Sequence, residues 1–172
     1  MFVARATMFL YDEFMGERVY VDASGILDEG RVEAWRGLIT ANARVIEKIE
    51  RALSEAGLPP LGWYDVLLEL SGASDGRLRM HELARAVVLS RSGLTRLVDR
   101  LERAGLLGRA PDPVDRRGSY AAITDEGRAL LRRMWPVYAA GIAEHFGGYL
   151  TDDEARVVAA ALGRVADAAR AR

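Results

Sequence analysis

Two short helical segments followed by two short extended segments limit the folds open to this chain more than any other feature. One helix is predicted from about Met80 to Val87, and a second from Arg91 to Ala104. Only the tight turn Leu89-Ser90 separates them; Ser90 is a favourable N-cap, and Gly105 ends the second helix as a C′ residue. Two helices joined by so short a turn form a helix-turn-helix unit. The second helix is predicted to bury one apolar stripe, made of Leu94, Leu97, Val98 and Leu101.

The extended segments that follow are predicted to form a β-hairpin. Strands are expected at about Leu106 to Ala110 and Tyr120 to Ile123, joined by the turn-rich stretch PDPVDRRGS. A hairpin directly behind a helix-turn-helix unit is called a wing. The predicted fold class is therefore mainly α with a small β-wing, a winged helix-turn-helix.

Amphipathic helices are predicted on both sides of this winged unit. One covers about Glu33 to Leu53 with a single apolar stripe, and another covers about Leu61 to Leu70, before the loop Ser71 to Gly76. Thr124 caps a helix that runs to about Phe146, and Thr151 starts the last helix.

These elements divide the chain into four predicted regions. Residues 1–30 form an N-terminal arm without a sustained period, and residues 31–60 hold an N-terminal dimerisation helix. Residues 61–124 form the winged unit, and residues 125–172 hold C-terminal dimerisation helices. A chain of this size does not easily bury the long terminal stripes alone, so a second copy is expected to cover them, which predicts a homodimer. Burial inside the same chain is the alternative.

The composition excludes several classes of chemistry. The 172 residues contain no cysteine and two histidines, which rules out disulfides, thiolate catalysis and cysteine-bound zinc. No phosphate-binding glycine loop with a following lysine and no Ser-His-Asp set is present, so the chain is not expected to be an enzyme or to need a cofactor or metal. It lacks an apolar run long enough to cross a membrane and an N-terminal signal-peptide stretch, which predicts a cytoplasmic protein.

The net charge of −1 conceals an uneven distribution of charge. Between Gly76 and Arg133 there are 13 arginines and 7 acidic residues, whereas acidic residues are in excess over the rest of the chain. A basic middle third is expected where only that part of a protein meets a polyanion. Chance clustering of solvated charges is the alternative.

The outer face of the second helix of the unit has the composition of a DNA-reading surface. Short hydroxyl side chains and arginines on its first turns can enter a major groove and reach base edges and phosphates. An ordinary amphipathic helix with a solvated face is the alternative. The residues left on this face by the apolar stripe are Ser92, Thr95, Arg96, Asp99, Arg100 and Arg103.

The stretch from Glu82 to Leu131 resembles the MarR family of bacterial regulators almost position by position. The family pattern has a recognition helix, a Gly-Leu pair, an arginine-bearing strand, a D-R-R wing tip and a T-x-x-G helix start. Ile123, Gly93 and the N-terminal arm depart from it. The matching residues are Thr95 to Glu102 (TRLVDRLE), Gly105-Leu106, Arg109, Asp115-Arg116-Arg117 and Thr124 to Gly127 (TDEG).

This resemblance implies a triangular homodimer that represses transcription by binding a pseudo-palindromic operator. Two recognition helices would enter successive major grooves of double-stranded DNA, and Arg117, braced by Asp115, would enter the adjacent minor groove. A surface ion pair that only closes the hairpin is the alternative for these two residues. The predicted DNA-binding residues are Ser90, Arg91, Ser92, Gly93, Thr95, Arg96, Arg100, Asp115, Arg116 and Arg117.

The resemblance also implies a small-molecule effector, since members of this family commonly bind phenolic or other aromatic anions that weaken DNA binding. An aromatic pair with an arginine suits an aromatic acid. The predicted effector residues are Trp35, Trp63, Tyr64, Asp65 and Arg109, with plain core packing of Trp63 and Tyr64 as the alternative. A different function for the whole chain, a winged-helix module for protein–protein interaction without specific DNA binding, also remains open.

Overall fold

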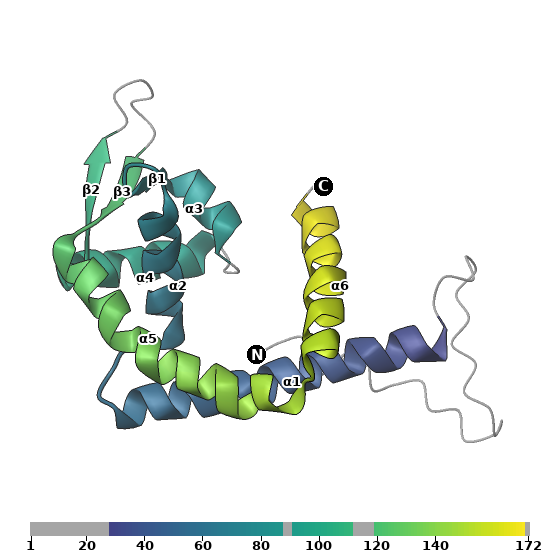
Figure 1. Cartoon of the computed structure of the whole chain (residues 1–172). Coiled ribbons are helices and arrows are strands. Elements are labelled where there is room, and N and C mark those ends of the chain that lie inside the picture. The colour runs from purple at the N-terminus through teal and green to yellow at the C-terminus, as the bar shows by residue number, and fades with distance from the viewer. Residues whose placement is uncertain (1–27, 88–90, 112–118, 171–172) are drawn as a thin grey trace, which may run out of the picture. The chain divides into compact units, whose positions relative to one another are not determined.

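The computed structural model describes residues 28–87, 91–111 and 119–170, which belong to two compact units, 1–44 and 45–172. The hydrophobic core and the sheet lie in the second unit. The predicted fold class, mainly α with a small β-wing, is confirmed (Figure 1). The elements are α1 (Glu29–Glu55), α2 (Leu61–Gly72), β1 (Arg77–Arg79), α3 (Met80–Ala86), α4 (Arg91–Arg103), β2 (Leu107–Pro111), β3 (Ser119–Ile123), α5 (Asp125–His145), the 3-10 turn η1 (Gly147–Tyr149) and α6 (Asp152–Arg170).

The predicted hairpin is present as strands β2 and β3. The two strands pair antiparallel from Leu107↔Ile123 to Pro111↔Ser119. Arg109 faces Ala121 in this register, and Ala121 is fully buried. The hairpin therefore covers the core with one face, as a wing does.

A third strand, β1, was not among the two strands predicted from the sequence. It pairs antiparallel with β3 through Arg77↔Ala122, Leu78↔Ala121 and Arg79↔Tyr120, which gives the strand order β1-β3-β2. The loop predicted from Ser71 is also shorter than expected, because α2 continues to Gly72. Arg-Leu-Arg contains no run of β-branched or aromatic residues, so its strand conformation depends on pairing with a distant segment.

The core is built around α2 and α4. Five of the 12 residues of α2 are buried, and Val66, Leu67 and Leu70 have no exposed surface. Burying a leucine side chain stabilises the fold by about 1.5–3 kcal/mol. The stripe predicted for α4 is confirmed, since Leu94, Leu97, Val98 and Leu101 are all buried.

Gly105 ends α4 in the way the sequence predicts. Its φ of 73° lies in the left-handed region, which a residue with a side chain rarely adopts. The Leu106 N–H donates to the Leu101 carbonyl at 3.0 Å, and the Gly105 N–H donates to the Glu102 carbonyl at 2.9 Å. This pair of hydrogen bonds is a Schellman motif, and it reverses the chain so that β2 begins at Leu107.

The start of α5 is fastened to the end of α4 by Thr124. Its hydroxyl accepts a hydrogen bond from the Gly127 N–H at 3.1 Å and donates one to the Gly105 carbonyl at 2.8 Å. Gly127 leaves no room for a side chain, because a Cβ there would lie 2.2 Å from the Leu106 carbonyl oxygen. The end of α4 and the start of α5 are therefore tightly packed against each other, and this contact is called the α4–α5 joint below.

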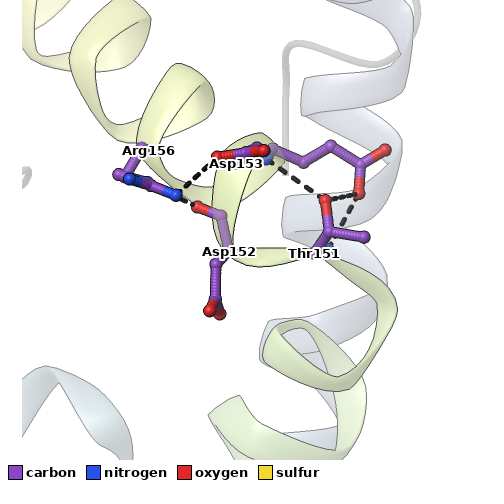
Figure 2. Close-up of polar contacts among 5 residues, drawn as sticks. Thr151, Asp152, Asp153 and Arg156 are labelled. Atoms are coloured by element: carbon purple, nitrogen blue, oxygen red, sulfur yellow. Dashed lines mark hydrogen bonds and ion pairs between the residues drawn. The ribbon is translucent and has the colours of Figure 1, made fainter.

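Helix α6 begins with a reciprocal cap at Thr151 (Figure 2). The Glu154 N–H donates to the Thr151 hydroxyl at 3.3 Å, and the Thr151 N–H donates to the Glu154 carboxylate at 2.8 Å. The Thr151 hydroxyl also donates to the Glu154 carboxylate at 2.7 Å, and the two hydrogen bonds that this carboxylate accepts, from the backbone N–H first and from the hydroxyl second, lower the pKa of Glu154. Arg156 forms an ion pair with Asp153 on the next turn. The acidic first turn is thus explained by the helix end that it stabilises.

Apolar side chains on the terminal helices remain exposed in the single chain. They include Trp35, Leu38 and Ile39 on α1 and Val157, Leu162 and Val165 on α6. Within the described ranges, none of the helices combines the length and the apolar character that crossing a bilayer requires.

Candidate nucleic-acid interface

Helix α4 presents its polar face to solvent while its apolar face fills the core. Thr95, Arg96, Arg100 and Arg103 are exposed, and Asp99 is partly exposed. Arg100 and Arg103 lie in the last turn, where positive charge also complements the helix dipole. The described part of the outer face predicted for DNA contact is therefore accessible to solvent, although Asp99 is also held by Arg109.

The N-terminal end of α4 is described only in part. Arg91 is its first residue, and Gly93 is half-buried. Ser90 and the side chains of Arg91 and Ser92 lie outside the description, so their predicted contacts remain predictions.

The tip of the wing likewise lies outside the described residues. The strand ladder ends at the pair Pro111↔Ser119. Asp115, Arg116 and Arg117 fall between these two positions, so the predicted brace of Arg117 by Asp115 remains a prediction.

Arg109 on β2 pairs with two carboxylates on α4. Its Nη2 lies 2.6 Å from Asp99 Oδ1, and its Nε lies 3.6 Å from Glu102 Oε2. Asp99 and Glu102 are three residues apart, so they lie on neighbouring turns of the same helix face. Sequence reasoning assigned Arg109 to an effector site and did not anticipate this link between wing and recognition helix.

Two arginines of the unpredicted strand β1 gather around Tyr120 of β3. The guanidinium carbons of Arg77 and Arg79 lie 5.1 and 5.5 Å from the centre of the Tyr120 ring. Arg79 Nε donates to the Tyr120 hydroxyl at 2.9 Å, and Arg77 forms an ion pair with Asp75. These two arginines belong to the basic middle third of the sequence, and the pairing of β1 with β3 reveals their position beside Tyr120.

The residues predicted for an effector site occupy different environments. Tyr64 is buried, and its ring packs edge-on against Tyr138 at 5.1 Å and stacks on Trp135 at 6.5 Å between ring centres. Trp63 is half-buried against the core, whereas Trp35 is 55% exposed and belongs to the unit of residues 1–44. Sequence reasoning missed Trp135 and Tyr138, which lie about 70 positions further along the chain.

Burial and neighbouring charge shift the titration of this aromatic cluster. Burial, and then the nearby Asp65 carboxylate, raises the pKa of Tyr64 and of Tyr138. The phenols therefore stay protonated at neutral pH and can donate hydrogen bonds.

Asp65 is exposed to solvent over much of its surface, and its carboxylate lies near two other carboxylates. Partial burial raises its pKa most, followed by the repulsion of Glu50 and Glu69. Glu50 is held in place because its carboxylate accepts the Leu61 N–H at the start of α2, at 3.0 Å. Among residues 28–87, 91–111 and 119–170, no group of acidic residues and histidines is placed so that it could hold a metal ion.

Comparisons with known proteins give a consistent result. A family model described as MarR family matches residues 56–118. The HTH-type transcriptional regulator YkoM of Bacillus subtilis strain 168 is 30% identical over 135 residues, which cover 76% of this chain and 86% of YkoM.

Two solved structures resemble the chain with a sequence identity similar to that of YkoM. AbsC, a MarR family transcriptional regulator from Streptomyces coelicolor, is 30% identical with a TM-score of 0.74, covering 85% of this chain and 98% of AbsC. Sco3205, a MarR family regulator from the same organism solved in complex with DNA, is 31% identical with a TM-score of 0.74, covering 83% of this chain and 89% of Sco3205. These proteins regulate transcription and are not enzymes, which confirms the prediction that the chain has no catalytic role.

Proposed function

This chain belongs to the MarR family of DNA-binding transcriptional regulators, and from that premise we propose that it is a repressor that binds a pseudo-palindromic operator as a homodimer. The observation that carries the proposal is the division of α4 into two faces. Its buried leucines fix the helix against the core, while Thr95, Arg96 and Arg100 remain exposed beside the β2–β3 wing. A rigidly held helix with this outer face suits the major groove.

The exposed apolar side chains of α1 and α6 support the homodimer. Large side chains such as Trp35 and Val165 are more than half exposed in the single chain. Covering them with the same helices of a second copy places two winged units in one molecule. Residues 31–60 and 125–172 would then serve as dimerisation regions and residues 61–124 as the DNA-binding region.

Repression is the simpler regulatory outcome for such a dimer. Occupying promoter DNA is enough to exclude RNA polymerase, whereas activation needs a further surface that recruits it. The proposed DNA contacts are the residues predicted on α4 and at its N-terminus, together with the tip residues Asp115, Arg116 and Arg117.

The aromatic cluster supports a small aromatic acid as the effector. Trp63 and Tyr64 supply apolar surface, and the protonated phenol of Tyr138 can donate a hydrogen bond. Arg109 would bind the effector carboxylate only by giving up Asp99 or Glu102, so effector binding would disturb the recognition helix. Asp65 and Trp35 are the other residues predicted to bind the effector, and Trp35 belongs to the separate unit of residues 1–44.

Binding to DNA over a range of salt concentrations tests the repressor proposal. A 30-base-pair duplex selected from a random pool should bind with log K falling by about 0.9 per phosphate neutralised for each unit of log salt. Arg117→Ala should reduce that slope by about one phosphate contact while the protein remains folded. Binding that does not depend on salt, or a shallow slope without sequence preference, would favour a protein–protein module.

Tryptophan fluorescence tests the effector proposal. Salicylate-like and urate-like acids should change the emission and release the duplex over the same concentration range. A coupling of about 1–3 kcal/mol between the two sites is enough to make this release measurable. No response in either signal across a panel of aromatic acids would contradict the proposed effector class.

A further inference from the structure

The ion pairs of Arg109 connect the wing to the recognition helix at a solvent-accessible position. The Arg109 side chain is 31% exposed, and those of Asp99 and Glu102 are 43% and 39% exposed. Ion pairs with this exposure contribute little to the stability of a fold. The role of these ion pairs therefore depends on the surface of α4 on which the two carboxylates lie.

Asp99 shares the outer face of α4 with the residues proposed to read DNA. It follows Thr95 by four positions and Arg96 by three, which places it beside both on the helix surface. A carboxylate at this place is repelled by DNA phosphates. Arg109 is the side chain that the structure places against it, at 2.6 Å, and the same guanidinium reaches Glu102 on the next turn.

We propose that Arg109 is a positioning residue for DNA binding, which neutralises Asp99 and Glu102 and holds strand β2 against α4 without itself contacting DNA. This inference rests on the proposed function. It predicts that Arg109 acts on affinity through the two carboxylates, and that it does not add a phosphate contact of its own.

The test compares Arg109→Ala with the wild-type protein and with Arg133→Ala on the selected duplex. Arg133 is exposed on α5, outside α4 and the wing, so its loss removes the same charge from a position that is not a proposed DNA contact. Arg109→Ala should weaken binding about tenfold at low salt, or about 1.4 kcal/mol, and the loss should shrink as added salt screens the two carboxylates. Arg133→Ala should change the affinity less than twofold, and the melting temperature of each variant should stay near that of the wild type.

A second substitution separates charge neutralisation from a purely structural role. If Asp99 repels DNA once Arg109 is gone, Asp99→Asn in the Arg109→Ala background should restore most of the lost affinity. Arg109→Lys should retain more affinity than Arg109→Ala, because it keeps the positive charge. A purely structural defect would not be rescued by Asp99→Asn, which removes the carboxylate that Arg109 holds.

Three outcomes would overturn the inference. An affinity loss in Arg109→Ala that keeps its full size at high salt would mean that Arg109 does not act through charge. Unchanged affinity in Arg109→Ala, or no recovery in the double variant, would leave the ion pair without a role in binding. Failure of the wild-type protein to bind DNA would overturn the proposed function as well, whereas normal wild-type binding isolates the role of Arg109.

Discussion

Arg96 is exposed on α4 and belongs to neither its buried stripe nor its closing turn. Arg96→Ala should therefore lower operator affinity by about 1–3 kcal/mol if the side chain reaches a base edge. The loss should be greatest for the preferred duplex and smaller for a scrambled one. Competition binding measures the difference, and thermal denaturation should show an unchanged midpoint.

Equal losses on preferred and scrambled DNA would contradict a base-reading role for Arg96. Such a result would place the side chain against the phosphate backbone.

Gly127 offers a test of the joint between α4 and α5. Gly127→Ala forces a Cβ to 2.2 Å from the Leu106 carbonyl oxygen, and backbone atoms cannot move aside as a flexible side chain can. Overpacking of this kind costs about 1–3 kcal/mol, which chemical denaturation can measure.

Gly108→Ala is the matched control for this joint, since a Cβ at Gly108 on the neighbouring strand β2 has no heavy atom within 4 Å. Its free energy of unfolding should stay close to that of the wild type. Equal stability of the two variants would show that the joint relaxes around a methyl group.

Asp65 makes stability depend on pH in a direction fixed by its raised pKa. The folded state binds its proton more tightly than the unfolded state does, so the ionised carboxylate destabilises the fold above the unfolded-state pKa of about 3.9. Asp65→Asn should therefore raise the melting temperature at neutral pH. The gain should shrink as the pH falls through the raised pKa toward 3.9.

Melting temperatures of the wild type and of Asp65→Asn, measured over a series of pH values, test this prediction. A variant that melts below the wild type at neutral pH would mean that the carboxylate is stabilised by a partner which outweighs its burial.

At the scale of elements, the helices could be predicted from the sequence because each carries its own period and its own ends. Gly105 marks the end of α4 because glycine readily adopts a positive φ, and Thr124 marks the start of α5 because its hydroxyl caps the helix. Strand β1 could not be predicted in this way, since its only reason to be extended is a partner more than 40 positions away.

The same distinction separates the parts of the candidate site. The polar face of α4 follows from helical spacing within one segment. The partners of Arg109 and of Tyr64 lie on other elements, and one sequence does not state which elements meet. Contacts between segments, rather than residue types, are what the structure adds.

Helix α6 provides a prediction at this scale. Deleting residues 151–172 removes the exposed stripe that includes Leu162 and Val165, and in the proposed dimer it would leave the facing surface of the second copy without cover. The truncated protein should aggregate or lose its cooperative unfolding transition. Sedimentation velocity and circular dichroism measure the two effects, and a folded, well-behaved monomer would contradict dimerisation through α6.

For the whole molecule, the uneven distribution of charge agrees with the separation of roles. The basic excess lies between Gly76 and Arg133, a range that contains α3, α4 and the wing, whereas α1 carries five acidic and five basic residues and α6 carries four and three. Long-range attraction would then orient the protein on DNA with the winged units first.

The strand order β1-β3-β2 leaves β1 and β2 as the two edges of the sheet, and both edges are poor templates for another strand. The three-residue strand β1 carries an arginine at each end, and β2 ends in Pro111, which has no N–H to donate. Growth of the sheet into amyloid-like fibrils is therefore disfavoured from either side. At high protein concentration, association is therefore expected through the exposed apolar stripes of the helices and not through the edges of the sheet.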